Sequence, residues 1–383
     1  MAEITKILGQ EKTIAKIDRL IKLGKRGQAL LITGSPGIGK FALAQYIVRR
    51  FLCSDNNSGC GKCFSCRSIN NQNHPDFLLV FPFPNIASES KKNPVFHFSD
   101  PTTGGARFSD EALDEANRFR NEKLADPYRQ VTFKRKGNIP VSVIKDLKKT
   151  VGKKPMLGKR RAIVICDIDQ MAFGAADLFL KTVEEPPEDS LIILTTSKPQ
   201  LLLPTLVSRT TRFALAPVSD DLIRNYLIEH GVKKAVDFYI SFSSGSPGLA
   251  LKAFEDETIS RRDLLWKLLS DFITSSPLPK TIESLHRRYR WPNFDEVRYD
   301  FEIMEKILHD IYIAKLGLDN SIINIDIKDK IIECAQSGPS VEILRKWFPA
   351  LVKASKAHGT NNVSADIAFI GAFIEFNRTR RFD

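Results

Sequence analysis

The chain has 383 residues, of which 43% are hydrophobic and 27% charged, a composition that is ordinary for a globular protein and leaves room for two or three domains with large cores. No apolar run approaches the roughly 20 residues that cross a bilayer, and the N-terminus Met1-Ala2-Glu3-Ile4 lacks the pattern of a signal peptide, so we expect no membrane association and a cytoplasmic protein. The formal net charge of +12 fits a partner that carries phosphates, either nucleic acid or nucleotide, but it fits a merely basic protein equally well.

The first predicted elements are an amphipathic helix over residues 11–23 and a buried strand over residues 29–33. A glycine-rich loop with the spacing G-x4-G-K follows the strand and leads into a helix. Strand, loop, lysine and helix are the parts of a phosphate-binding P-loop, in which backbone N–H groups and the lysine surround phosphates. The alternative is a glycine-rich turn without function. The candidate nucleotide-site residues are Gly34, Gly37, Gly39 and Lys40.

The residue after this lysine is Phe41, where a P-loop ATPase has a Ser or Thr whose hydroxyl holds Mg²⁺. The loop can hold phosphate without that hydroxyl, but it has lost a metal ligand. We therefore expect a degenerate site that binds ATP or ADP without turnover, if it binds them, and where Mg²⁺ binding is doubtful.

Four of the six cysteines lie close together with the spacing C-x6-C-x2-C-x2-C, namely Cys53, Cys60, Cys63 and Cys66. In a reducing compartment such a cluster is typical of a metal site rather than of disulfides. Four thiolates suit tetrahedral Zn²⁺ and leave no open position for a substrate, so the pattern predicts a structural zinc knuckle over residues 53–66. An iron–sulfur cluster or free thiols are the alternatives.

A second buried strand is predicted over residues 77–81, followed by a surface insertion over about residues 82–138. One exposed helix, over residues 110–121, is expected in the insertion, to which we assign no chemistry. A basic amphipathic helix over residues 143–151 comes next. Its lysines could contact phosphates, but a solvated face is the favoured interpretation.

The third predicted strand, residues 162–166, ends at Asp167. An Asp at a strand end near a P-loop is the usual partner of Mg²⁺. In an active ATPase a Glu follows and polarises the attacking water, but here Ile168 follows. If Asp169 is taken instead, Gln170 follows. Neither register supplies the base, which agrees with the loss at Phe41.

A helix that ends at two prolines comes next. Strands over residues 191–196 and 213–216 then complete the N-terminal region of alternating strands and helices. Alternating strands and helices predict an α/β fold, with a parallel sheet covered by helices on both faces. Strand signals fade after residue 219. Longer helices are predicted near residues 260–273, 297–316, 340–357 and 363–378.

Several of these pieces together resemble a known family. They are residues 7–11, the P-loop, the cysteine knuckle followed by Asn73-His74-Pro75-Asp76, residues 180–187, Ser208-Arg209 and residues 245–248. The chain resembles the bacterial clamp-loader subunits of DNA polymerase III, which are AAA+ proteins, and among them the delta-prime type, which is related to gamma/tau. The most specific part is the run Leu-Lys-Thr-Val-Glu-Glu-Pro-Pro with Ser-Arg about two dozen residues later.

The resemblance implies an AAA+ P-loop domain over residues 1–217, a small helical lid domain over residues 218–256 and an all-helical oligomerisation collar over residues 257–383. It implies that Arg209 is an arginine finger that acts in trans in the ATP site of a neighbouring subunit. Thr196 falls near the family's first sensor position. Gly248 takes the place of the second-sensor arginine, a third departure from an active site.

The implied function is that of a stator which helps to load the sliding clamp onto primed DNA and is not a hydrolase by itself. The implied partners are gamma/tau and delta subunits in a hetero-pentameric ring, and through the complex the sliding clamp and primed DNA. One alternative is an ATP-hydrolysing motor subunit of the gamma/tau type. Another is a DNA-binding module that uses the basic and aromatic run His286-Arg287-Arg288-Tyr289-Arg290-Trp291.

Overall fold

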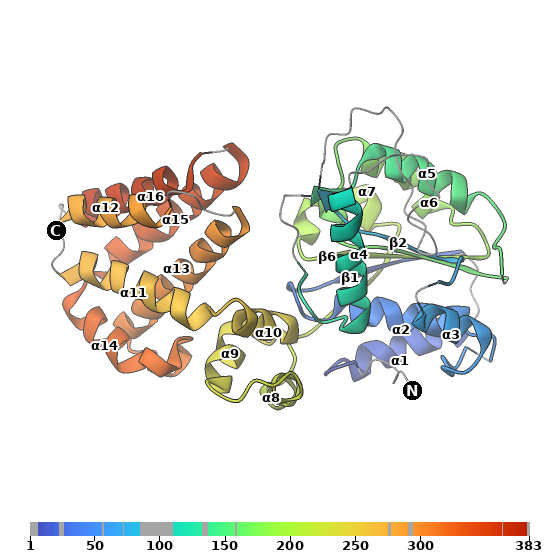
Figure 1. Cartoon of the computed structure of the whole chain (residues 1–383), viewed down its shortest axis with the longest axis horizontal. Helices are drawn as coiled ribbons and strands as arrows, with labels where there is room; N and C mark the ends of the chain where they lie inside the picture. Colours follow the sequence, from blue (N-terminus) through green and yellow to red (C-terminus); the bar gives the residue numbers. More distant parts are fainter. Residues whose placement is uncertain are drawn as a thin grey trace. The chain divides into compact units, whose positions relative to one another are not determined.

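The computed structural model describes residues 7–22, 27–55, 57–71, 73–84, 110–131, 137–157, 159–274, 277–289, 294–361 and 363–380 (Figure 1). The chain divides into two compact units. The first is Met1–Tyr226 with Gly245–Leu249, and the second is Leu227–Ser244 with Ala250–Asp383. The finer division into three domains, with boundaries after residues 217 and 256, stays a prediction.

The first unit is built on a five-stranded parallel sheet in the order β2-β5-β6-β1-β7. Its strands are β1 Gln28–Thr33, β2 Phe77–Val80, β5 Arg161–Ile165, β6 Ser190–Thr196 and β7 Thr211–Ala214. A separate two-stranded antiparallel sheet pairs β3 Phe83–Pro84 with β4 Gly137–Asn138. The predicted parallel sheet is confirmed. Four strands lie where their apolar runs predict them, because strands covered on both faces are apolar throughout. The last strand begins two residues before its predicted start.

Helices cover both faces of this sheet (Figure 1). Figure 1 shows α5 and α6 on one face, and α1, α2 and α3 on the other. The helices are α1 Glu11–Lys22, α2 Lys40–Leu52, α3 Phe64–Asn70, α4 Asp110–Ala125, α5 Val141–Val151, α6 Ala175–Glu184 and α7 Pro204–Val207, with short 3₁₀ turns Ile168–Gln170 and Pro199–Leu201.

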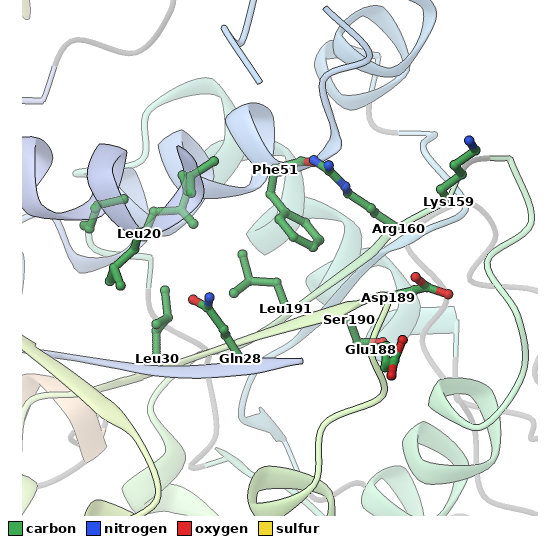
Figure 2. Close-up of a pocket in the computed structure, with 13 residues that line it drawn as sticks. Leu20, Gln28, Leu30, Phe51, Lys159, Arg160, Glu188, Asp189, Ser190 and Leu191 are labelled. Atoms are coloured by element: carbon green, nitrogen blue, oxygen red, sulfur yellow. The ribbon is translucent and has the colours of Figure 1, made fainter. Parts of the chain in front are cut away.

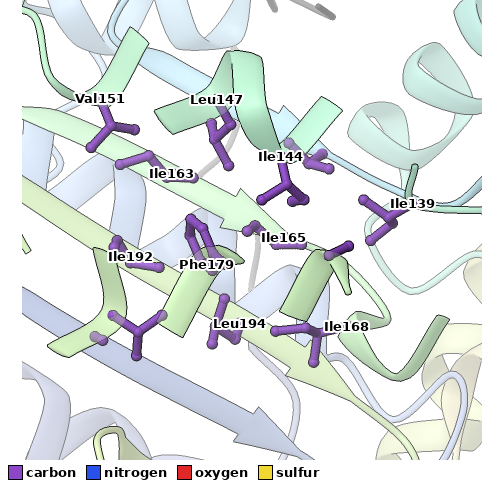
Figure 3. Close-up of a cluster of buried hydrophobic side chains, with 14 of the residues drawn as sticks. Ile139, Ile144, Leu147, Val151, Ile163, Ile165, Ile168, Phe179, Ile192 and Leu194 are labelled. Carbon is purple, nitrogen blue, oxygen red and sulfur yellow. The ribbon is translucent and has the colours of Figure 1, made fainter. Parts of the chain in front are cut away.

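The basic helix α5 packs on the sheet through its apolar face, beside α6 (Figure 3). Ile144 and Leu147 of α5 pack with Phe179 of α6 over strand residues such as Ile163, and all four are buried. Burying each such side chain stabilises the fold by about 1.5–3 kcal/mol. The lysines of α5 lie off this apolar face, where Lys145 is exposed.

The predicted helix in the insertion forms as α4, but it is not exposed along its whole length. Ala116 and Phe119 are buried, and the ring of Phe119 stacks on Phe81 with centroids 4.4 Å apart. The helix therefore packs on the end of β2 instead of standing in solvent. The insertion residues 85–109 and 132–136 lie outside the described part of the chain.

The second unit is helical throughout its described residues. Its helices are α9 Val236–Ser243, α11 Thr258–Thr274, α12 Leu278–Arg288, α13 Phe294–Lys315, α14 Lys328–Ser337, α15 Val341–Asn361 and α16 Ala365–Arg380, while α8 Asp220–Glu229 and α10 Pro247–Glu255 each have residues in both units. 3₁₀ turns occupy Asp319–Ser321 and Ile325–Ile327. Aromatic rings form much of the core, with Trp347 stacked on Phe376 at 4.5 Å between centroids. Helices α9, α12 and α14 were not predicted from the sequence. Within the described ranges, none of the helices combines the length and the apolar character that a bilayer crossing needs.

Candidate nucleotide site and metal centre

The loop between β1 and α2 has the backbone that a P-loop requires. Gly37 has a φ of +72° and Gly39 a φ of +106°, a left-handed conformation in which residues other than glycine are strained. Helix α2 begins directly afterwards at Lys40, so the positive end of the helix faces the loop. The predicted strand, loop and helix are therefore all present.

Lys40 is folded back on its own loop. Its ammonium donates hydrogen bonds to the carbonyl oxygens of Gly34 at 3.0 Å and Ser35 at 2.9 Å, and to the hydroxyl of Ser197 at 2.7 Å. These three bonds use all the protons of a lysine ammonium. The chain itself satisfies the group that would otherwise bind phosphate.

The burial of Lys40 makes a pH-dependent contribution to stability. Burial lowers its pKa from 10.5 to about 8, with Lys123 acting in the same direction and Asp167, Asp169 and Cys166 opposing it. Between these two values the unfolded chain binds more protons than the folded chain, so stability rises with pH through this window.

We expect this rise to disappear in a Lys40→Met variant. From about pH 7.5 to about pH 9.5 the wild-type chain should gain about 2 kcal/mol of unfolding free energy relative to the variant. Denaturant titrations of both chains at the two pH values measure this difference, and the other titrating groups cancel between them. A constant difference would show that Lys40 titrates normally.

The two positions that should supply a metal ligand and a base are buried in apolar surroundings. Phe41 is 5% exposed. Ile168 is 3% exposed and belongs to the core beneath α5 and α6 (Figure 3). Neither side chain carries the hydroxyl or the carboxylate that the site would need.

Asp167 and Thr196 lie at the ends of the adjacent strands β5 and β6. The Asp167 backbone N–H donates to the Thr195 hydroxyl at 3.2 Å, and burial raises the pKa of the Asp167 carboxyl, while Lys40 opposes that shift. The Thr196 hydroxyl donates to Asp169 at 2.5 Å and accepts the Lys198 N–H at 2.9 Å. Asp167 thus interacts with the charge of Lys40, whereas Thr196 is engaged with Asp169.

Residues 246–248 close over the P-loop. The Ser246 hydroxyl donates to the Pro36 carbonyl at 2.6 Å, and the Gly248 N–H donates to the Gly37 carbonyl at 3.0 Å. A Cβ on Gly248 would overlap the carbonyl oxygen of Tyr128. The packing therefore accepts glycine here and leaves no room for an arginine.

Arg209 follows α7 and is partly exposed, with 36% of its side chain accessible. Its guanidinium forms an ion pair with Glu184 and donates to the Thr205 carbonyl at 2.8 Å. Glu184 ends α6, within the Leu-Lys-Thr-Val-Glu-Glu-Pro-Pro run, so the two most specific pieces of the sequence meet in space. The sequence analysis did not find Glu184 as the partner of Arg209.

Two residues that the sequence analysis missed, Lys123 and Tyr128, lie against the P-loop. A Cβ on Gly39 would lie 2.5 Å from a ring carbon of Tyr128, and the Lys123 ammonium lies 5.8 Å from the centroid of the Phe41 ring. Both residues belong to the insertion that was expected to carry no chemistry. No motif or periodicity in that segment points to them.

The four predicted cysteine ligands come together between α2 and α3. Their sulfur atoms all lie within 4.8 Å of one another, with Cys53 Sγ 3.7 Å from Cys60 Sγ and 3.9 Å from Cys63 Sγ. Sulfur atoms about 2.3 Å from one tetrahedral Zn²⁺ are about 3.8 Å apart, so the donor set fits that ion. The cluster can therefore bind a metal ion.

The environment of one of these thiols, Cys63, favours the thiolate form. Burial acts to raise the pKa of Cys63, but hydrogen bonds from Ser54 and from the Cys66 N–H outweigh it and lower the pKa to about 6. Thiolate is the form that coordinates metals. Cys166 and Cys334 are buried in the core as expected, and neither belongs to the cluster.

The Asn73-His74-Pro75-Asp76 segment has a structural role next to the knuckle. The buried Asp76 carboxylate accepts the backbone N–H groups of Met156 at 2.7 Å and Leu157 at 2.8 Å, and it lies 3.6 Å from the Arg161 guanidinium. These contacts tie the start of β2 to the turn before β5. The sequence analysis quoted the segment without assigning this role.

The described part of the basic run after residue 285 is paired within the second unit. His286 contacts Asp366, Arg287 contacts Glu283 and Arg288 contacts Asp300. Tyr289 is buried, with its ring stacked on Phe369. Arg290 and Trp291 lie outside the described residues. The run is thus a packed corner as far as it is described, and the Tyr289 ring has no free face for a base.

A pocket opens at the end of the sheet opposite the P-loop (Figure 2). It is lined by α1, α2 and the amino ends of β1 and β6, with Leu20, Phe51 and Leu191 on its apolar side and Lys159 and Arg160 near its rim. The P-loop follows the carboxyl end of β1, so this pocket lies away from the P-loop.

This chain is similar to known proteins over most of its length. Residues 9–219 match the model of the family described as DNA polymerase III, delta subunit. The chain is 27% identical over 256 residues to DNA polymerase III subunit delta' of Escherichia coli (strain K12), a match that covers 66% of this chain and 62% of that protein. It is 22% identical over 369 residues to DNA polymerase III subunit delta' of Bacillus subtilis (strain 168), with 92% of each chain covered. DNA polymerase III subunit tau of E. coli is 24% identical over 226 residues, which is 58% of this chain and 27% of that protein.

Proposed function

This chain belongs to the family described as DNA polymerase III, delta subunit, and from that premise we propose that it is a delta-prime-type stator of the clamp loader. In this role it helps to load the sliding clamp onto primed DNA. It keeps a nucleotide site that does not turn over ATP, and it contributes Arg209 to the ATP site of a neighbouring subunit.

One observation carries the proposal. The places for a metal-binding hydroxyl, a catalytic base and a sensing arginine are taken by Phe41, Ile168 and Gly248, and all three are closed by packing. Metal-dependent phosphoryl transfer needs groups that hold the metal and orient the water, and Phe41 and Ile168 can supply neither the metal-binding hydroxyl nor the base. The likeness to subunits named delta' supports the same assignment.

Arg209 is suited to act on a neighbour. Its side chain is partly exposed, with its Nε paired to Glu184 and its Nη1 donating to the Thr205 carbonyl. A guanidinium keeps its charge at any physiological pH and can meet two phosphate oxygens at once. An arginine supplied from another subunit can neutralise charge on the transferring phosphate.

The proposed partners are subunits of the gamma/tau and delta types in a hetero-pentameric ring, and through the complex the sliding clamp and primed DNA. We propose an AAA+ domain over residues 1–217, a lid over residues 218–256 and a collar over residues 257–383 that joins the ring. We also propose that the four-cysteine cluster binds structural zinc, for which the sulfur positions provide the support.

Hydrolysis by the chain alone separates the stator from a motor subunit. We expect the purified chain with magnesium and ATP to release no phosphate above the uncatalysed background. In the reconstituted loader, Lys40→Ala should leave the DNA-stimulated ATPase within about twofold of wild type, since the Lys40 ammonium is already bound by its own loop. Brisk phosphate release by the chain alone, lost on Lys40→Ala, would establish a motor subunit of the gamma/tau type.

A further inference from the structure

The segment Lys123–Tyr128, which joins the end of α4 to the turn after it, lies on the nucleotide site. The tyrosine is 3% exposed, and its ring lies directly on Gly39, the last residue before α2. The phosphates of a nucleotide bind at such a helix start, against the backbone N–H groups of the loop. The ring therefore covers the place where they would lie.

The tyrosine hydroxyl makes a second contact, with the segment that precedes α1. It accepts the backbone N–H of Leu8 at 2.7 Å, and burial raises the pKa of Tyr128 to about 12, so the phenol stays neutral. Its own carbonyl oxygen lies against Gly248. One side chain and its backbone thus bridge the segment before α1, the P-loop and the residues that close over the loop.

Lys123 takes a second position in the same site. Its ammonium lies 5.8 Å from the Phe41 ring centroid and donates to the Arg129 carbonyl at 2.6 Å, and it interacts with the charge of Asp167. In a P-loop ATPase, Mg²⁺ is held between the residue after the lysine and an acid at a strand end. These positions correspond to Phe41 and Asp167, so an ammonium stands where a metal ion would be needed.

Further contacts hold the segment in place. The Asp126 carboxylate accepts the Tyr128 N–H at 3.0 Å and the hydroxyl of Tyr226 at 2.7 Å. On the other side, Phe119 of α4 stacks on Phe81. A nucleotide would have to break these contacts before it could reach the loop.

We propose that the Lys123–Tyr128 segment is an internal occupant of this chain's own nucleotide site, with the lysine ammonium in the place of the magnesium ion and the phenol ring across the phosphate position. ATP and the segment then compete for one space, and the segment occupies that space when no nucleotide is bound. The inference deepens the proposed function, on which it rests for the idle state of the site, but it concerns nucleotide binding and not the action of Arg209.

Calorimetric titration of the full chain with ADP and magnesium tests this. The double variant Lys123→Ala, Tyr128→Ala should bind ADP at least about tenfold more tightly than wild type, because the competing occupant is gone. Adding Lys40→Ala to that variant should remove the gain, which places the ADP on the P-loop. A double variant that unfolds cooperatively yet binds ADP no more tightly than wild type would overturn the proposal.

A milder variant keeps the test decisive if the double variant does not fold. Tyr226→Phe removes only the hydroxyl bond to Asp126 and should tighten ADP binding about fivefold, the equivalent of one hydrogen bond. An unchanged affinity would count against the proposal. A second result would also count against it: the wild-type chain binds ADP, the binding depends on Lys40, and the amide exchange of residues 123–130 does not change. These outcomes do not depend on Arg209, so they are separate from a failure of the stator role.

Discussion

Replacing Arg209 by alanine is expected to abolish ATP hydrolysis at the subunit interface to which we propose that it contributes. An arginine finger contributes roughly 10³–10⁵ in rate, so hydrolysis at that interface should fall by about 10³-fold. The physical reason is the loss of a fixed positive charge beside the transferring phosphate. The measurement is the steady-state ATPase of the reconstituted loader with clamp and primed DNA, together with clamp loading in the same assay.

The chain offers matched controls for this variant. Arg209→Lys keeps the charge but loses the planar fork, so it should restore little of the rate. Arg212→Ala removes a nearby arginine, which bonds to the Thr33 hydroxyl at 3.3 Å and has no proposed role in trans. That variant should leave the rate close to wild type. Glu184→Gln weakens the ion pair that positions Arg209 and should give an intermediate loss.

The outcome that reverses this assignment is equally specific. If Arg209→Ala leaves the loader at full rate while Lys40→Ala stops it, this chain hydrolyses ATP itself and receives a finger instead of providing one. Circular dichroism and thermal unfolding of each variant should match wild type, since Arg209 is partly exposed and its ion pair is worth little to stability.

The second large effect is expected from loss of the metal. Wild-type chain should contain close to one zinc ion, and Cys60→Ser should contain almost none, because three thiolates and a hydroxyl hold the ion far less well. Structural zinc contributes about 10–16 kcal/mol of binding free energy in isolated zinc-finger peptides, and within a larger domain we expect a loss of several kcal/mol. Metal analysis and thermal unfolding of the purified chains measure both effects.

Cys334→Ser is the matched control for this variant, because it removes a buried thiol from the second unit. It should lower stability modestly through the buried hydroxyl and leave the zinc content unchanged. A chelator should reproduce the effect of Cys60→Ser on wild type and have no further effect on the variant. Wild-type chain that holds no zinc and is still folded would rule out the metal site.

The amino-acid sequence by itself determined the sheet, the P-loop and the grouping of the four cysteines. Apolar runs such as residues 162–166 are long enough only for buried strands, so their place in the sheet follows from burial alone. The glycines of the P-loop and the four cysteines act through spacing within one short segment. The departures from the ATPase pattern at Phe41 and Ile168 could be recognised for the same reason, because each is one position within a short local motif.

Only the tertiary structure decided which side chains lie on the P-loop and which residue pairs with Arg209. Tyr128 meets Gly39 and Leu8 across long stretches of chain, and its own segment carries no motif. Glu184 and Arg209 likewise meet only because α6 and α7 pack together. A sequence pattern records local preference and burial, whereas the choice of which distant side chain enters a given space is made when the elements pack, by shape and charge that no single segment contains.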